Sequence, residues 1–286
     1  MKRVEARAPV RLDLAGGWTD VPPYTFDVGG EVVNVAINIH AHASLEIDDD
    51  GRLSVNYRCD APVGSGLGTT GAINVALMAA INGADNAEEA AYQFEALLGN
   101  TGGRQDQWAS KHGGFNHLIF IGDTVEEMPF DPPRSARFWL QKHLIVANTG
   151  IPHVSGDLHD VIWEKYAAQD EGVIEGLMTI RMAARKMSQG LSQDRRDIVV
   201  ESLQDICKGV DALDPALHEP FREVVNPLLE SKDVVAWKAL GAGGGGCVAL
   251  LVGHQRQQAV ITACEAAGWD VLDWDYDDEG LVINAN

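Results

Sequence analysis

Apolar and polar positions alternate, with many β-branched side chains, in three stretches near the start of the chain. This alternation is typical of strands that bury one face, and it predicts strands at residues 32–39, 43–47 and 53–57. The residues between the last two stretches, Asp48-Asp49-Asp50-Gly51, are typical of a hairpin turn. The pattern therefore predicts antiparallel strands in the amino-terminal part.

Helical patterns follow. An apolar run predicts one helix at 72–81, and a second is expected at 87–98, with Asn86 as a candidate N-cap and Gly99 as a stop signal. The remaining pattern predicts helical tracts at 160–187, 197–213 and 256–267, and strands at 143–147, 247–252 and 271–276. Strand runs mixed with helices indicate an α+β fold.

The clearest break in the pattern is Asp131-Pro132-Pro133. A chain of 286 residues is long enough for two domains. We therefore predict one domain over residues 1–138 and a second over residues 139–286.

Composition and charge narrow the range of partners. The chain has 22 Lys and Arg against 42 Asp and Glu, a formal net charge of −20, so nucleic acid and anionic membranes are poor partners. Its four cysteines are far apart and pair with no histidine at metal-ligand spacing, which favours reduced thiols. No apolar stretch is long enough to cross a bilayer, and residues 1–10 lack the apolar part of a signal peptide. We expect a cytoplasmic enzyme, monomeric or homodimeric, with a small-molecule substrate.

A glycine-rich run, residues 62–71, precedes the helix predicted at 72–81. Glycine lets the backbone approach an anion closely, and the first N–H groups of a helix point at it. Such a run suits a triphosphate, and Thr69 or Thr70 can offer a hydroxyl to a phosphate or to Mg²⁺. No lysine follows the last glycine, so this is not the usual P-loop. An ordinary helix-capping turn is the alternative, and the spacing Gly66-x-Gly68-x-x-Gly71 alone is a weak dinucleotide signal.

A second candidate region is residues 9–20. Arg11 and Asp13 alternate with apolar neighbours, so both would project from one face of a strand. The following loop holds an indole, a hydroxyl and a carboxylate, which suit a polyol such as a sugar. An ordinary surface turn is the alternative. The three loop residues are Trp18, Thr19 and Asp20.

A third region contains two carboxylates. Asp106 can accept the proton of an attacking hydroxyl or hold that hydroxyl in line with a phosphoryl group; an N-cap for residues 107–111 is the alternative. Glu95 lies on or beside an apolar stripe, where Mg²⁺ would be a suitable partner; a glutamate reaching water is the alternative. A last glycine cluster, residues 241–246, can pass beside a ligand or form only a flexible turn.

In this order, these regions resemble the GHMP kinase superfamily, named for galacto-, homoserine, mevalonate and phosphomevalonate kinases. The signature regions are residues 9–20, 62–71 and 238–247, so the resemblance spans nearly the whole chain. Residues 15–24, 29–30 and 33–37 look like the kinase domain of L-fucokinases. Residues 103–107 and 279–283 look like the related bacterial heptose kinases.

The resemblance implies the GHMP kinase fold, with an amino-terminal domain like the second domain of ribosomal protein S5, a ferredoxin-like carboxy-terminal domain and the active site between them. It implies ATP binding by Pro62, Gly64, Ser65, Gly66, Leu67, Gly68, Thr69 and Thr70. It implies Mg²⁺ ligation by Thr70 and Glu95, and catalysis by Asp106 with Arg11. It implies sugar contacts from Trp18, Thr19, Asp20, Gly103, Gly243 and Gly244.

The implied reaction is ATP-dependent phosphorylation of the anomeric (C1) hydroxyl of a fucose-like or related monosaccharide. The alternative substrate is D-glycero-D-manno-heptose 7-phosphate, which needs a basic receptor. The candidate cations for that receptor are Arg104, Lys111, His112 and His153. Leu240 departs from the family pattern, which usually has Ser or Thr there, so one polar contact is missing.

Two other classes of protein are possible. A nicotinamide-binding dehydrogenase would place its glycine motif after a buried strand, and the polar, Pro-terminated residues 58–62 fit that context badly. A non-catalytic sensor of nucleotide or sugar is the other. The presence of Asp106, Glu95 and Arg11 argues against it, since a sensor needs no catalytic base.

Overall fold

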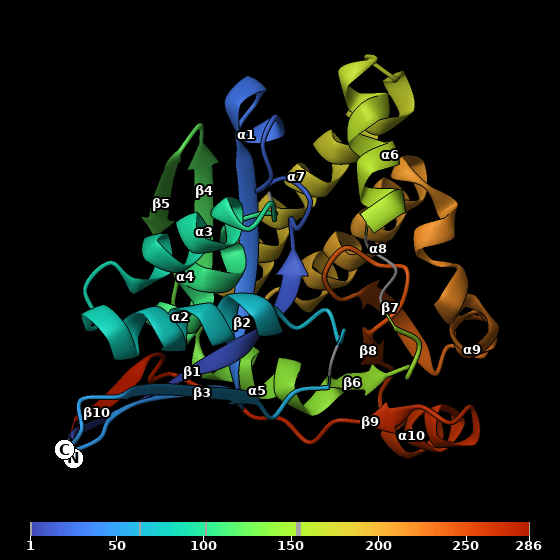
Figure 1. The fold of residues 1–286 in the computed structure, drawn as a ribbon. Coiled ribbons are helices and arrows are strands. Elements are labelled where there is room, and N and C mark those ends of the chain that lie inside the picture. The colour runs from blue at the N-terminus through green and yellow to red at the C-terminus, as the bar shows by residue number, and fades with distance from the viewer. Residues whose placement is uncertain (1, 63, 101, 153–155, 286) are drawn as a thin grey trace.

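The computed structural model describes residues 2–62, 64–100, 102–152 and 156–285 (Figure 1). Its larger sheet is antiparallel and joins strands from both ends of the chain. Strand order is β10-β1-β2-β4-β5, and β3 also pairs with β2. The strands are β1 (Lys2–Ala15), β2 (Gly30–Ile47), β3 (Leu53–Cys59), β4 (Phe115–Ile121), β5 (Thr124–Met128) and β10 (Val282–Ala285).

The smaller sheet has the order β7-β8-β6-β9. Its strands are β6 (Leu144–Asn148), β7 (Val234–Ala239), β8 (Cys247–Val252) and β9 (Asp270–Val271). Every residue of β8 is buried, as expected for the central strand of a sheet covered on both faces.

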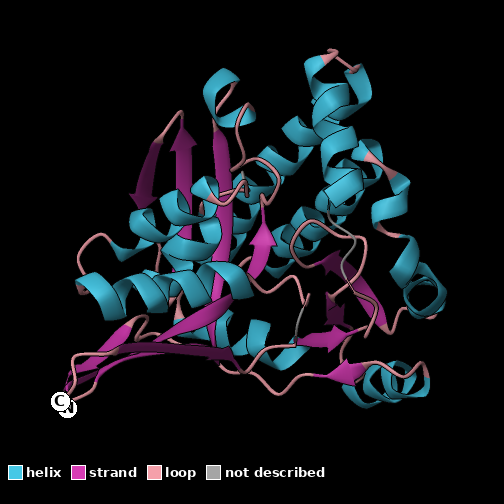
Figure 2. Ribbon diagram, in the orientation of Figure 1, coloured by secondary structure: helices cyan, strands magenta, loops and turns pink. Residues whose placement is uncertain are grey.

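Helices surround both sheets (Figure 2). Helices α2, α3 and α4 pack together near β1 and β2, and α7 packs against α8 while also contacting β2. The helices are α1 (Tyr24–Asp27), α2 (Thr69–Asn82), α3 (Ala87–Leu97), α4 (Gln105–His112), α5 (Arg134–His143), α6 (Gly156–Ala167), α7 (Glu171–Ser192), α8 (Arg196–Leu213), the 3₁₀ helix η1 (Pro215–Leu217), α9 (Glu219–Glu230) and α10 (Gln257–Ala266).

A bulge in β1 and β2 decides which side chains reach the cleft. Ala6 and Ala8 belong to the cluster that packs with α2, whereas Leu12, after the bulge, belongs to the central core with α7 and α8. The pairing shifts between Pro9 and Val10, and residues 38–39 of β2 have no partner on β1. Because a bulge reverses the alternation of faces, the odd-numbered residues after it point away from that core.

The structure corrects several predicted boundaries. Strands 32–39 and 43–47 are one strand, β2, because pairing resumes after the bulge. The tract 160–187 is divided between α6 and α7, since Gln169 has a positive φ of 60° and Asp170 caps α7 by accepting a bond from Val173 N–H. The strand predicted at 271–276 pairs over only two residues in β9, followed by a bridge at Tyr276.

The other predicted helices and strands lie close to where the pattern placed them, whereas β4, β5, β7, β10, α5 and α9 were not predicted. Asn86 does precede α3, but it has a left-handed φ of 57° and its side chain makes no capping bond. No helix in the described part of the chain is both long and apolar enough to cross a bilayer. The division of the chain into two domains at residue 138 stays a prediction. Strand β10 belongs to the predicted second domain, yet it pairs with β1 of the first.

Candidate active site

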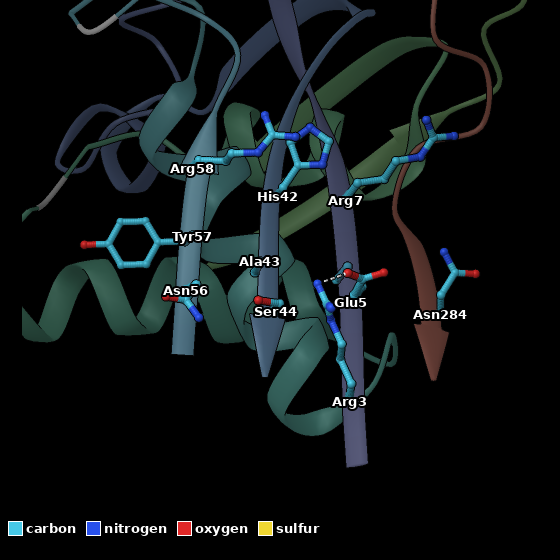
Figure 3. A pocket seen from close by; sticks show the side chains of 11 residues that line it. Arg3, Glu5, Arg7, His42, Ala43, Ser44, Asn56, Tyr57, Arg58 and Asn284 are labelled. Carbon is cyan, nitrogen blue, oxygen red and sulfur yellow. Dashed lines mark ion pairs between the residues drawn. The ribbon is translucent and has the colours of Figure 1, made fainter. Parts of the chain in front are cut away.

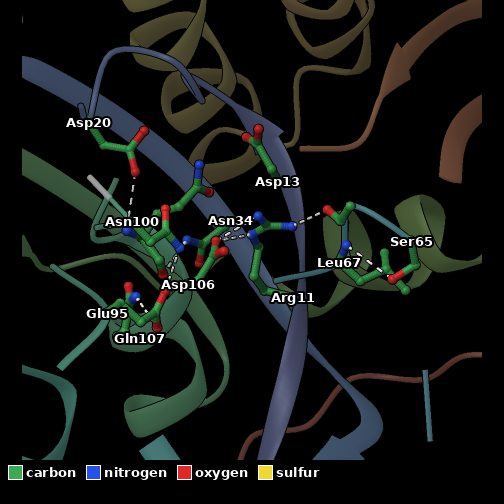
Figure 4. Close-up of polar contacts among 12 residues, drawn as sticks. Arg11, Asp13, Asp20, Asn34, Ser65, Leu67, Glu95, Asn100, Asp106 and Gln107 are labelled. Carbon is green, nitrogen blue, oxygen red and sulfur yellow. Dashed lines mark hydrogen bonds and ion pairs between the residues drawn. The ribbon is translucent and has the colours of Figure 1, made fainter. Parts of the chain in front are cut away.

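Four distant segments line one cleft with a volume of about 880 Å³. They are the end of β1 with the loop after it, the end of β3 with the glycine-rich loop that follows it, the region from Glu95 to Gln107, and the start of α6. Gly241 and Ala242 close it from the smaller sheet. Figure 4 shows Asp106 between Asp20 on one side and the glycine-rich loop on the other.

The glycine-rich loop needs its glycines. Gly66 and Gly68 have φ values of 73° and 74°, where other residues are strained. A Cβ on Gly66 would lie 2.3 Å from the Leu240 carbonyl oxygen, and a Cβ on Gly68 would lie 2.9 Å from Asp106 Cγ. Helix α2 begins at Thr69 with Gly68 at the N-cap, so its free N–H groups stand at the cleft, where an anion is favoured.

Ser65 and Leu67, two of the predicted ATP-binding residues, have side chains that point into the core, and their carbonyl groups anchor the loop. The side chains of Ser65 and Leu67 are fully buried. Arg11 N–H donates to the Leu67 carbonyl at 3.0 Å, and Cys247 N–H donates to the Ser65 carbonyl at 2.8 Å. Gly64, Gly66, Gly68, Thr69 and Thr70 line the cleft, whereas Pro62, Ser65 and Leu67 do not.

Arg11 and Asp106 form a pair at the centre of the cleft. The Arg11 guanidinium donates from Nε and Nη2 to Asp106 Oδ1, at 2.8 and 2.6 Å. Its Nη1 donates to the Gly66 carbonyl at 2.6 Å. Arg11 is 4% exposed and the Asp106 side chain 26% exposed, so the arginine fixes an accessible carboxylate beside the loop.

The N-cap alternative for Asp106 is wrong. Helix α4 begins one residue earlier, at Gln105, with Arg104 at the N-cap position. The carboxylate is turned toward Arg11 instead. Both guanidinium bonds fall on Oδ1, which leaves Oδ2, next to Gly68, as the oxygen that can take a proton.

Glu95 is buried and faces the same cleft. Its oxygens accept bonds from Gln107 Nε2 at 2.9 Å and Asn100 Nδ2 at 3.1 Å (Figure 4). Burial raises the pKa of this carboxyl group above its ordinary value, against the lowering effect of its amide partners. The alternative of a glutamate reaching water is therefore wrong.

Asp20 is a third acid in the cleft, and among the described residues it has no cationic partner of the kind that Asp106 has. It is 3% exposed and accepts a bond from Gln105 N–H at 3.2 Å. Burial, with the charge of Asp106 as a second cause, raises the pKa of Asp20 to about 7. A Cβ on Gly103 would lie 1.8 Å from the carboxylate, so only glycine fits there.

Trp18 lies beside this acid. Its ring stacks on His159 of α6 with centroids 4.9 Å apart, and both residues line the cleft. The Trp18 indole N–H is buried with no hydrogen-bond partner among the described residues. A donor of this kind favours a ligand with an oxygen acceptor. The sequence pattern did not single out His159. Because His159 lies far along the chain from Trp18, no local pattern indicates that the two rings meet.

Three predicted sugar-binding residues need correction. Thr19 is fully buried, and its hydroxyl donates to the Gly16 carbonyl at 2.7 Å and accepts from Glu31 N–H at 3.1 Å. It therefore holds the turn in place. Gly243 and Gly244 do not line the cleft; they pack on the Leu217 carbonyl of η1. The third signature region reaches the cleft at Gly241 and Ala242 instead.

A buried ion pair that the sequence pattern left unassigned joins the two sheets beside the site. Lys238 Nζ on β7 donates to Asp13 Oδ2 on β1 at 2.7 Å, and both side chains are at most 5% exposed. Asp13 is two residues from Arg11 and on the same strand face, as predicted. The pair is 225 residues apart in sequence, which explains why no local pattern indicated it.

The cations proposed for a sugar phosphate lie elsewhere. Arg104 stacks on Tyr92 with Cζ 3.9 Å from the ring centroid and pairs with Glu89. Lys111 donates to the Ala84 carbonyl, and His112 pairs with Glu127 at 3.1 Å. None of the three lines the cleft. His153 lies outside the described residues.

Comparisons with known proteins agree with the resemblance to GHMP kinases. Residues 31–114 match the family described as GHMP kinases N terminal domain. The D-glycero-alpha-D-manno-heptose 7-phosphate kinase of Campylobacter jejuni is 23% identical over 339 aligned positions, covering 98% of this chain and 98% of that protein. The bifunctional fucokinase/GDP-fucose pyrophosphorylase of Arabidopsis thaliana is 22% identical over 87% of this chain and 30% of that protein.

Solved structures show the same fold over the whole chain. The crystal structure of a D-glycero-D-manno-heptose 1-phosphate kinase from Bacteroides thetaiotaomicron superposes with a TM-score of 0.80 at 21% identity, covering 98% of both chains. A mevalonate kinase structure superposes with a TM-score of 0.69 over 96% of this chain and 99% of that one, at 13% identity. At 21% and 13% identity, this structural similarity establishes the fold alone.

Proposed function

We propose that this chain, whose residues 31–114 match the GHMP kinases N terminal domain, is an ATP-dependent kinase for the anomeric (C1) hydroxyl of a neutral, fucose-like monosaccharide. One observation carries the proposal: Arg11 links the Asp106 carboxylate to the Gly66 carbonyl through bonds of 2.6–2.8 Å. That contact puts a proton acceptor beside a loop suited to phosphate, which is what a phosphoryl transfer to an alcohol requires.

The chemistry follows from this placement. The sugar oxygen bonds to the terminal phosphorus of ATP while the bond from that phosphorus to the bridging oxygen breaks, so ADP leaves. The hydroxyl proton passes to Asp106 Oδ2. Arg11, fixed at the same point, offsets negative charge that develops on the transferred group. The N–H groups at the start of α2 hold the donor phosphates.

Mg²⁺ would be held by Thr70 and Glu95, and the residues fit it. Both line the cleft, both offer oxygen, and the raised pKa of Glu95 is what a buried carboxylate without a bound cation has. When bound, Mg²⁺ neutralises charge on the donor phosphates. Among the described residues there is no group of three or more acidic, His or Cys ligands, so most other ligands would be phosphate oxygens and water.

A neutral sugar suits the far end of the cleft. Trp18 offers an apolar ring face and an unpartnered N–H, and Asp20 offers a carboxyl group that is partly protonated near neutral pH. The cations considered for a sugar phosphate, Arg104, Lys111 and His112, do not reach this space.

A second candidate is the heptose 7-phosphate, favoured by the similarity to the Campylobacter jejuni kinase over 98% of both chains. Among the described residues, the basic side chains besides Arg11 that line the cleft are Arg58 and His159. Arg58 would have to leave Asp60, its present partner, to receive a phosphate.

A sugar panel with an ADP-release assay tests both candidates. We expect L-fucose or a related 6-deoxyhexose to stimulate ADP release, with the phosphate on the anomeric oxygen by NMR. Activity confined to heptose 7-phosphate would replace the first candidate with the second. Binding of ATP and sugar without any ADP release would instead indicate a sensor.

A further inference from the structure

Strand β3 is an uncovered edge of the larger sheet. Its inner edge pairs with β2 from Leu53 to Cys59. Across residues 2–62, 64–100, 102–152 and 156–285, no strand pairs with its outer edge. A free edge presents main-chain groups to another chain, and natural proteins usually protect it with lysine, proline or a bulge. Residues 53–59 contain no lysine and no proline, and their register with β2 is unbroken.

The main-chain groups that face outward can be assigned from the ladder. The bonds from Asp48 N–H to Arg52 O and from Asp60 N–H to His40 O lie at the two ends of the hairpin. Hydrogen-bonded and non-hydrogen-bonded pairs alternate in an antiparallel ladder, so every even-numbered residue between them bonds to β2. The N–H and C=O groups of the odd-numbered residues therefore point outward. These are Leu53, Val55, Tyr57 and Cys59.

The same odd-numbered residues carry apolar side chains that the fold leaves exposed. Leu53 is 60% exposed, Val55 41% and Tyr57 64%. They lie on the sheet face that α2 covers and stay exposed although α2 approaches β3, and Ile81 at the end of α2 is 48% exposed. The opposite face is polar. Figure 3 shows Arg58 of β3 there, level with His42 and Arg7 of the neighbouring strands, and Asn56 level with Ser44 and Glu5.

We propose that β3 pairs with β3 of a second copy of this chain, antiparallel about a two-fold axis at Asn56. In this register Val55 lies opposite Tyr57 of the second copy, and Leu53 opposite its Cys59. All four outward-facing residues are then hydrogen-bonded, and apolar side chains meet on the α2 face. The two larger sheets become one continuous sheet.

Charge complementarity selects this register and this partner. With Asn56 on the axis, Arg52 of each copy lies opposite Asp60 of the other, two oppositely charged pairs at the ends of the interface. A shift of two residues, with Val55 on the axis, would place Arg52 opposite Arg58, which is unfavourable. The chain carries a net charge of −20, so a contact between copies needs such local pairing to oppose the long-range repulsion.

The pairing would also reach the active site. Tyr57, Arg58 and Cys59 at the end of β3 line the proposed nucleotide cleft. A second strand on the outer edge would hold this wall of the cleft in place from the side opposite β2.

Sedimentation of the purified full chain tests the interface. We expect the wild-type protein to sediment with the mass of two chains at micromolar concentration, and Val55→Lys to sediment as a single chain, because a charged lysine on a free edge opposes pairing. The matched control is Ile121→Lys, an apolar strand residue that is 58% exposed on β4; this variant should remain a dimer. A single-chain wild type, or a dimeric Val55→Lys, would overturn the proposal.

Disulfide trapping tests the register without depending on Val55→Lys. Residues facing each other at a non-hydrogen-bonded antiparallel position have Cα atoms about 4.5 Å apart, within the range that a disulfide spans. Asn56→Cys should therefore cross-link two chains under mild oxidation. In Ser54→Cys the two thiols would be four residues apart along the strand, about 13 Å, so it should give about tenfold less cross-linked dimer, no more than the native cysteines give in the wild type. Equal cross-linking of the two variants would overturn the register.

Discussion

Carboxylates at the two ends of the cleft are stabilised in opposite ways. At the loop end, Asp106 shares one oxygen with two N–H groups of Arg11, and Asp13 nearby is paired with Lys238. At the tryptophan end, Asp20 is more deeply buried than Asp106, accepts a bond from Gln105 N–H and contacts no cation among the described residues, and its pKa is raised to about 7.

The difference separates two ways of tolerating an acid away from water. A cation stabilises the ionised form, whereas burial without one stabilises the protonated form. The first fixes the orientation of a carboxylate, as the proposed base requires. The second allows a carboxyl group to donate a hydrogen bond as well as accept one, which suits the hydroxyls of a sugar.

The largest effect is expected from Asp106→Asn. The amide oxygen can still accept bonds from Arg11, but the amide cannot take the sugar's proton, so we expect kcat to fall by about 10²–10⁴-fold. The dissociation constant for ATP, measured by calorimetry, should stay nearly unchanged. Asp160→Asn, which alters an exposed acid in the same cleft, should keep most of the activity. Normal turnover in Asp106→Asn would remove this residue from the mechanism.

Lys238→Met tests whether the ion pair with Lys238 is what stabilises the buried Asp13 carboxylate at the loop end. The variant leaves Asp13 buried without its cation, and we expect the free energy of unfolding to fall by about 3–5 kcal/mol in urea titrations. The double variant Asp13→Leu/Lys238→Met removes both charges and should recover most of that loss. A double variant no more stable than the single one would contradict this account of the pair.

The pH dependence of stability tests the tryptophan end. The folded pKa of Asp20, about 7, is above its ordinary value of 3.8, so the folded state binds more protons than the unfolded state between these values. The contribution of Asp20 to the free energy of unfolding is therefore lost as the pH rises from about 4 to about 7. The loss is at most about 1.4 kcal/mol for each unit of pKa shift.

Asp20→Asn removes this titration. Urea unfolding at pH 5 and pH 8 should show the wild type losing stability relative to the variant at the higher pH. Asp197→Asn is the control, because the Arg195 guanidinium lowers the pKa of Asp197 to about 2, below the range tested. Parallel behaviour of wild type and Asp20→Asn would show that Asp20 is ionised throughout.

The smallest effect is expected from Trp18→Leu. Loss of the ring face and its N–H should raise KM for the sugar about tenfold, in line with the worth of one stacking contact, and leave KM for ATP unchanged. Trp139→Leu, on α5 and stacked on His143, should change neither. An equal rise in both KM values would indicate that Trp18 supports the whole cleft and does not select the sugar.

Parts of the candidate site were indicated by the sequence because they depend on residue types at short spacing. The glycines from Gly64 to Gly71 and the alternation of Arg11 with Asp13 are local features, whereas the role expected of Asp106 came from the family resemblance. The structure brings Arg11, Gly66 and Asp106 into contact. Helices and strands with clear periodicity were found for the same reason.

Tertiary structure alone decided which side chains face the cleft and how their charges are balanced. A bulge changes which side chains of β1 face the cleft. Ser65 and Leu67 point into the core, and the Thr19 hydroxyl donates to the Gly16 carbonyl instead of facing the cleft. Lys238 reaches Asp13 across 225 residues, and Asp20 has a raised pKa because of the atoms packed around it. Burial and pairing depend on contacts between segments that no local pattern records, whereas residue chemistry and periodicity are written along the chain.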